Sequence, residues 1–231
     1  AMDPQQRLLL LNAHRAIEDA GIKDHPGFAR TGVFVAQYAS EYMQFANDYD
    51  KDNALFIATG NAGSIAANRL SYHYGFRGPS LVLDTACSST LVAIDIACQY
   101  LRSGQIDFAL VGGISLNLSP ALTRLLQDSG MLSPTGRCQT FDAKADGYVP
   151  GEGVGMIVLQ READARQHQK QHPDARLYAL IAGSAVNQDG KSNGMTAPNG
   201  LAQEEVIRQA FERAGLAPSQ AGYVETHGTG T

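Results

Sequence analysis

The fold is decided by the stretch Ser80-Leu81-Val82-Leu83-Asp84-Thr85-Ala86-Cys87-Ser88-Ser89. Its first four residues follow Gly78-Pro79 and form a short apolar run, which is typical of a buried strand. Residues 91–101, which come next, are long enough and apolar enough for three turns of helix. Cys87 is therefore predicted at a strand-to-helix turn, with its thiol beside the first free amides of the helix.

Two interpretations of Cys87 follow from this position. Unpaired amides and the helix dipole stabilise a thiolate, so the turn resembles a nucleophile elbow with sulfur in place of oxygen. A free cysteine can equally be a buried structural thiol. This stretch alone leaves both interpretations open.

Composition excludes several classes of protein. The chain has 231 residues, 44% of them hydrophobic, and a net charge of −5 with no run of Lys or Arg, which argues against nucleic acid as a partner. Three cysteines without framework spacing fit a reducing compartment. The longest aliphatic run near the N-terminus, Leu8 to Leu11, is too short for a membrane span. We expect a soluble, cytoplasmic protein with no membrane partner.

The first half of the chain alternates strand and helix signals. Asp3-Pro4 predicts a capped helix that runs through Ala20 and stops at Gly21. The segment 37–53 is polar with interleaved aromatic residues, and we favour a helix packed on the core over a lid or a partner-facing segment. Further strands are predicted at 31–36, 80–83, 108–113 and 154–159, helices at 65–72 and 120–127, and an ordered loop over a site at 131–153.

A charged, glutamine-rich segment at 161–176 predicts a surface helix and a boundary. His168 and His172 are four residues apart, but the zinc-protease glutamate is absent, so a solvated helix face is favoured over a metal site. Beyond it we predict strands at 177–186 and 222–225 and a helix at 201–214. Strands that alternate with helices imply an α/β fold with mostly parallel sheets, whose strands are buried on both faces.

Two nucleotide-binding signals fail. Gly190-Lys191-Ser192 resembles the end of a P-loop, but the earlier glycine that the motif requires would be at position 185, which is Ala185. Gly151, Gly153 and Gly155 precede a strand, whereas a dinucleotide motif follows one.

His227 ends the last predicted strand and enters the turn Gly228-Thr229-Gly230-Thr231. Taken alone, it would be a capped surface histidine. Together with a cysteine at an elbow turn, it favours a Cys/His acyl-transfer site.

Several motifs, in order along the whole chain, resemble those of β-ketoacyl synthases. They are Asp84 to Ser89, Gly136-Arg137-Cys138 with Phe141-Asp142-Ala143, Asp146-Gly147-Tyr148 with Gly151-Glu152-Gly153, and Glu225 to Thr231. Asp3-Pro4-Gln5-Gln6-Arg7 and Val186-Asn187-Gln188-Asp189-Gly190 are similar, more narrowly, to the ketosynthase domain of modular type I polyketide synthases.

The resemblance implies a thiolase-like fold with αβαβα layers, truncated here at both ends. Residues 1–165 would be the N-terminal half that carries the cysteine, and 166–231 the beginning of the C-terminal half. It also implies a homodimer within a multidomain synthase. The family's second catalytic histidine and its lysine would lie beyond Thr231, so the isolated fragment is expected to be inactive.

The resemblance also implies site residues and a reaction. Cys87 would be the acylated nucleophile, His227 a catalytic histidine, and Thr229 and Thr231 would bind the phosphopantetheine arm of an acyl carrier protein. The reaction is a decarboxylative Claisen condensation of the Cys-bound acyl chain with a malonyl-type extender, in polyketide or related fatty acid biosynthesis. It requires no metal and no cofactor bound directly. The alternative is a condensation-silent module that is acylated or only dimerises.

Overall fold

The structure is a computed structural model that describes residues 1–38, 40–45 and 51–231. The chain forms two compact units, one of Ala1–Ala175 with His227–Thr231 and one of Arg176–Thr226.

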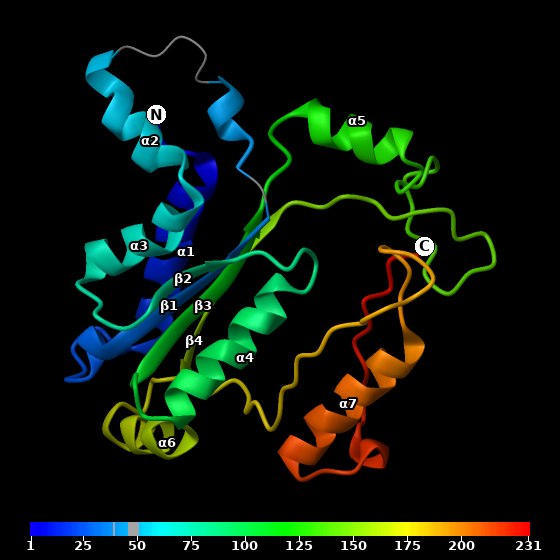
Figure 1. Cartoon of the computed structure of the whole chain (residues 1–231). Coiled ribbons are helices and arrows are strands. Elements are labelled where there is room, and N and C mark those ends of the chain that lie inside the picture. The colour runs from blue at the N-terminus through cyan, green and yellow to red at the C-terminus, as the bar shows by residue number, and fades with distance from the viewer. Residues whose placement is uncertain (39, 46–50) are drawn as a thin grey trace. The chain divides into compact units, whose positions relative to one another are not determined.

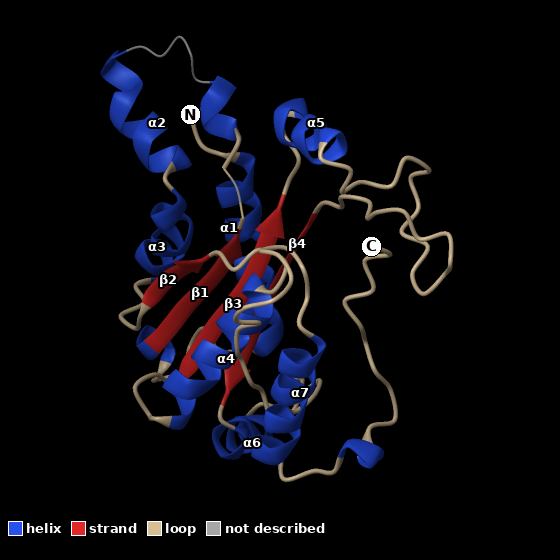
Figure 2. Cartoon of the chain, turned by 45° about the vertical axis from the view of Figure 1, so that its right-hand side comes forward, coloured by secondary structure: helices blue, strands red, loops and turns tan. Residues whose placement is uncertain are grey.

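The first unit is built on a four-stranded sheet in the order β2-β1-β3-β4 (Figure 2). The strands are β1 (Thr31–Gln37), β2 (Ser80–Leu83), β3 (Phe108–Ser115) and β4 (Gly153–Gln160). β1 pairs in parallel with β2 and β3, whereas β4 runs antiparallel to β3. All four strands lie where the sequence predicts them, within one or two residues.

The strands differ in burial, which corrects the expectation that each is buried on both faces. Every residue of β1 is buried, and so is most of β3, because these two strands are central. β2 and β4 lie at the edges, where Leu81 is 37% and Ile157 is 44% exposed. An edge strand has a neighbour on one side only, so part of its apolar surface stays open.

Helices cover both faces of this sheet (Figure 1). On one face α1 (Pro4–Ala20) packs against β4 and β3, and α3 (Gly63–Tyr74) packs against β2 and β1. On the other face lies α4 (Ser89–Arg102), which the sequence predicts directly after Cys87. The first core contains Leu9, Ile17, Leu70, Val33 and Leu110, and the second contains Phe34, Ala93, Ala97, Leu101 and Val111.

Helix α1 begins and ends at the predicted residues. The Asp3 carboxylate accepts a hydrogen bond from the Gln5 amide at 2.7 Å, and Pro4 occupies the first turn. Gly21 ends the helix with a φ of 63°, a left-handed conformation that glycine adopts without strain.

The helix predicted for 37–53 is not formed in the described part of this segment; residues 39 and 46–50 lie outside the described residues. Two short 3₁₀ turns, Tyr42–Phe45 and Lys51–Asn53, precede α2 (Ala54–Asn61). Tyr38, Met43 and Phe45 are about half exposed, so they form no face that packs on a core. Gly60 lies in α2, and Gly63 begins α3, two residues before the predicted start of that helix at residue 65.

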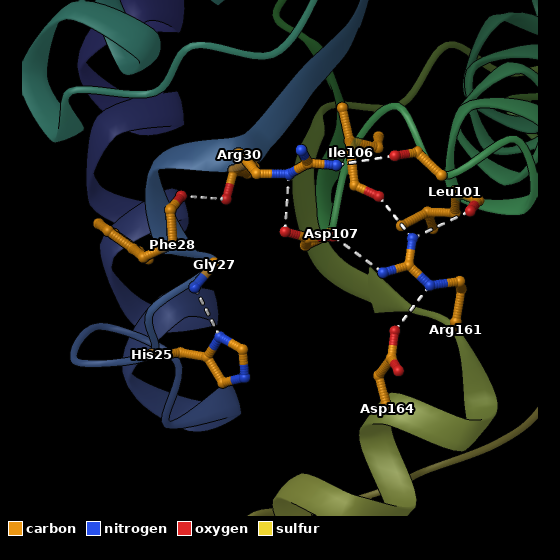
Figure 3. A network of polar contacts seen from close by, with 11 residues as sticks. His25, Gly27, Phe28, Arg30, Leu101, Ile106, Asp107, Arg161 and Asp164 are labelled. Atoms are coloured by element: carbon orange, nitrogen blue, oxygen red, sulfur yellow. Dashed lines mark hydrogen bonds and ion pairs between the residues drawn. The ribbon is translucent and has the colours of Figure 1, made fainter.

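A polar network at the amino end of β3 joins residues next to β3 and β4 with the short 3₁₀ helix Phe28–Arg30 before β1 (Figure 3). Arg161 pairs with Asp107 at 2.9 Å and with Asp164 at 2.6 Å, and donates to the carbonyls of Leu101 and Ile106. The other oxygen of Asp107 pairs with Arg30 at 2.8 Å. One carboxylate therefore bridges two guanidinium groups from distant parts of the chain.

The prediction of a solvated helix face is confirmed for His172, which is exposed, but is wrong for His168. It lies on α6 (Glu162–Gln171) but is only 6% exposed. Its ring lies 5.4 Å from that of His25 and 4.5 Å from that of His172. The helix turns this side chain toward Gly21 at the end of α1, an arrangement that the polar sequence of α6 does not reveal.

The second unit contains α7 (Gly200–Ala214) and a short 3₁₀ helix, Pro218–Gln220. Helix α7 begins after Asn199, whose side-chain carbonyl accepts a hydrogen bond from the Leu201 amide, and it ends at the left-handed Gly215. These bounds are close to the predicted 201–214. The predicted strands at 177–186 and 222–225 are not formed: residues 176–226, all described, contain no strand. A strand requires a hydrogen-bonded neighbour, and this unit offers none.

One further helix, α5 (Pro120–Asp128), follows β3 and also matches its prediction. Among the described residues no helix is both long and apolar enough to cross a bilayer.

Candidate active site

Cys87 lies in the turn between β2 and α4, two residues before the helix begins, and it is exposed. The preceding residue, Ala86, has a φ of 54°. A non-glycine residue in this left-handed region costs about 1–3 kcal/mol, so its surroundings must hold it there.

Side chains of the same turn supply those restraints. The Asp84 carboxylate accepts a hydrogen bond from the Ala86 amide at 2.9 Å. The Ser89 hydroxyl accepts from the Thr85 amide at 2.8 Å and donates to the Ala86 carbonyl at 2.6 Å. The predicted strand-to-helix turn is therefore formed, and Cys87 lies within it.

Two glycines of β3 allow the elbow to approach the sheet. A Cβ at Gly113 would overlap the Thr90 hydroxyl in the first turn of α4. A Cβ at Gly112 would overlap the Met156 sulfur and the Gly155 carbonyl of β4. Glycine at both positions brings α4, β3 and β4 together at the carboxyl end of β3.

A cavity of about 860 Å³ opens at this end of the sheet, and Cys87 lies in its wall. Its volume falls in the range of about 300–1,000 Å³ that is usual for sites of small molecules. Parallel α/β sheets usually bind ligands at the carboxyl ends of their strands, and this cavity lies at the carboxyl ends of β1 and β3. Apolar side chains from several elements line it: Ile94, Leu122, Leu126, Met131, Val149 and Met156.

Two carboxylates join the loops at the rim of this cavity. Glu41 accepts hydrogen bonds from the amides of Leu118 and Ser119 at 2.8 and 3.0 Å, which ties the segment 40–45 to the start of α5. Glu152 accepts from the Asn117 amide at 2.7 Å. Three segments of the chain therefore form the opening, and hydrogen bonds from backbone amides to these two carboxylates hold the segments together.

Tyr148 also lines the cavity. Burial raises the pKa of its phenol, and the nearby Cys87 and Tyr38 raise it further. A neutral hydroxyl consequently shares the cavity with the Cys87 thiol.

The other predicted site residues lie beside the loop 131–153. The Gly228 carbonyl accepts a hydrogen bond from the Thr140 hydroxyl, and the Gly230 carbonyl accepts one from the Gly147 amide at 3.1 Å. The hydroxyls of Thr229 and Thr231 lie 2.9 Å apart. His227 is exposed, and none of the three lines the cavity in the described structure. Cys87 and this turn are not brought together.

Sequence reasoning missed Glu41, Ser89 and Tyr148. Tyr148 stands inside a quoted motif, and a serine two residues after the cysteine is a usual helix-start residue, so both carried a local signal. Glu41 carried none, because the amides it binds lie 77 and 78 residues further along the chain.

Comparisons with known proteins agree with this architecture. Residues 1–165 match the family model "Beta-ketoacyl synthase, N-terminal domain", and residues 178–231 match "Beta-ketoacyl synthase, C-terminal domain". The chain is 52% identical over 233 residues to one phenolphthiocerol/phthiocerol polyketide synthase polypeptide of Mycobacterium tuberculosis, and 49% identical over 232 residues to another. All of this chain is matched in both cases, and it spans 12% and 15% of the lengths of these relatives.

Solved structures show the same fold. The ketosynthase from module 6 of the bacillaene synthase of Bacillus subtilis matches all of this chain with a TM-score of 0.89 at 42% identity, over 38% of its own length. An oxazolomycin ketosynthase domain from Streptomyces albus gives a TM-score of 0.89 at 40% identity, over 40% of its own length. The chain thus belongs to the β-ketoacyl synthase family and has the thiolase-like α/β fold of its ketosynthase domains.

Proposed function

We propose that this chain is part of a polyketide synthase ketosynthase, an acyltransferase that condenses a Cys87-bound acyl chain with a malonyl-type extender. The observation that carries the proposal is the place of Cys87, at the start of α4 and in the wall of a largely apolar cavity. An apolar cavity suits an acyl chain, and a helix N-terminus suits a thiolate.

In the first step Cys87 attacks an acyl thioester and takes over the acyl group, while the donor thiol leaves. One thioester replaces another, so the step needs activation more than driving force. The Cys87 amide would donate to the oxyanion that develops, a contribution of roughly 3–4 kcal/mol.

In the second step the malonyl-type unit loses carbon dioxide, and the resulting enolate attacks the acyl carbonyl on Cys87. Neutral His227 would donate a hydrogen bond to the extender's thioester oxygen and so stabilise the enolate. Thr229 and Thr231 would hold the phosphopantetheine arm that an acyl carrier protein presents. Their position in the turn Gly228–Thr231 is anchored by Thr140 and Gly147.

The proposal extends to the setting of the enzyme. Residues 1–165 would belong to the N-terminal and residues 166–231 to the C-terminal thiolase-like half of one subunit. Two such subunits would form a cytoplasmic homodimer within a multidomain synthase. The two polyketide synthase relatives, each far longer than the matched segment, support this setting. Mixing differently tagged copies of the natural polypeptide, followed by co-purification, would test the dimer.

Condensation is tested with the full natural polypeptide, an acyl thioester and malonyl carrier protein. We expect a β-keto product from the natural sequence and its loss in His227→Ala. His14→Ala is the matched control, because His14 lies exposed on α1 and its Nε2 pairs with Glu18 at 3.1 Å, within the same helix. An acyl adduct on Cys87 without any β-keto product would favour the condensation-silent alternative instead.

A further inference from the structure

Ser89 combines burial with a complete set of hydrogen bonds at the elbow. It is 5% exposed and is the first residue of α4. Its hydroxyl links the Thr85 amide to the Ala86 carbonyl, and its own amide donates to the same carbonyl at 3.1 Å. One side chain thus ties the residue before the left-handed Ala86 to the carbonyl of Ala86 itself.

We propose that Ser89 is a positioning residue for Cys87, which rests on the proposed role of Cys87 as the nucleophile. Ser89 does not act on the thiol itself. It keeps Ala86 at a φ of 54° and thereby turns Cys87 toward the cavity at the N-terminus of α4. Without the hydroxyl, the Thr85 amide loses its partner and Ala86 can relax to an ordinary conformation.

Ser88 provides the comparison, because it is a neighbouring serine with a different set of contacts. Its hydroxyl donates to the Thr85 carbonyl at 2.9 Å and lies 2.9 Å from the Thr85 hydroxyl. It is exposed, it does not line the cavity, and neither of these contacts is made to an atom of Ala86. Loss of this hydroxyl should leave the carbonyl of Ala86 in place.

The test measures the rate at which iodoacetamide alkylates Cys87 at neutral pH in the full natural polypeptide. Peptide mass spectrometry distinguishes Cys87 from Cys98 and Cys138. Ser89→Ala should slow alkylation of Cys87 by about 10-fold, because the thiol would turn away from the helix N-terminal amides that favour its reactive form. Ser88→Ala, which leaves the contacts of Ser89 intact, should stay within about twofold of the natural rate, and Ser89→Thr, which keeps a hydroxyl, should retain most of it.

A suppressor separates positioning from a merely structural role. Glycine adopts a positive φ without strain, so Ala86→Gly should restore the alkylation rate in a Ser89→Ala background. If Ser89→Ala alone does not fold, the double variant is compared directly with the natural sequence. A folded double variant that reacts slowly, or a Ser89→Ala variant that reacts as fast as Ser88→Ala, would overturn the proposal. Iodoacetamide needs no acyl substrate, so this result is independent of whether condensation occurs.

Discussion

At the residue scale, the site depends on a glycine, a residue that has no side chain. Gly113 leaves room for Thr90, and this contact brings the first turn of α4, with the Cys87 elbow, against the end of β3. The sequence shows the glycine pair only as the end of an apolar run. Its packing role becomes visible when α4 and β3 are seen together.

Gly113→Ala should therefore destabilise the protein by about 1–3 kcal/mol, the usual cost of forcing a methyl group into a packed site. Thr90→Ala in the same chain removes the hydroxyl that the new methyl would overlap and should recover part of this loss. Urea unfolding of both single variants and the double variant gives the coupling energy. Gly63→Ala is the control, because nothing lies near its Cβ position. Purely additive effects at positions 113 and 90 would contradict the packing argument.

Prediction at this scale succeeded where the signal was local. Cys87 could be placed at a turn because an apolar strand precedes it and a helical run follows it. The left-handed Ala86 could not be predicted, since alanine carries no preference for that conformation. The cavity could not be predicted either, because its walls come from segments that are distant in sequence.

At the element scale, α6 shows how a polar helix can bury one titratable residue. Burial lowers the pKa of His168, and the nearby His172 and His25 lower it further. The backbone of Gly21 and Ala20, at the end of α1, opposes this shift. The neutral ring is therefore the form that the folded protein favours.

Because its pKa is lower in the folded state, His168 binds protons more readily in the unfolded state. Its contribution to stability is present above the ordinary pKa of 6.5 and is lost as the pH falls toward the lower folded value. His168→Phe should reduce the slope of unfolding free energy against pH in that window, by at most about 1.4 kcal/mol per pH unit. The exposed His14→Phe is the control, and an unchanged slope in the His168 variant would refute this account.

Helix α1, whose start and stop signals are local, was predicted better than the strands beyond residue 176. Helix α1 was found in full because its start signals, Asp3 and Pro4, and its stop signal, Gly21, act within a turn of the chain. The apolar run 177–186 looked like a strand but forms none, since a strand also needs a partner that its own sequence does not encode. The segment 37–53 was mistaken for a helix because its aromatic residues suggested a core-facing surface that they do not form.

At the scale of the whole molecule, the two ends of the sheet in the first unit differ in role. The cavity lies at the carboxyl ends of β1 and β3, whereas the network of Arg161 and Asp107 lies at the amino end of β3 (Figure 3). The cavity that contains Cys87 and the polar network are therefore separated by the length of β3. Variants of the network should change stability without changing the site.

Arg161→Met should lower the free energy of unfolding by about 1–3 kcal/mol, because it leaves the half-buried Asp107 and two carbonyls without this donor. Arg166→Met is the matched control on the same segment, since Arg166 pairs with the exposed Glu162, and such pairs contribute little. Denaturant unfolding measures both variants, and Cys87 alkylation should be unchanged in each. Equal stability of the two variants would show that the network is not a structural cross-link.

The proposed function depends on the transfer of an acyl group to Cys87. The full natural polypeptide is incubated with an acyl thioester, and the acylated cysteine is located by peptide mass spectrometry, with Cys87→Ala in parallel. Our account predicts an acyl adduct on Cys87 and none in the variant. No adduct on Cys87, or an adduct on Cys98 or Cys138 that persists in Cys87→Ala, would contradict it.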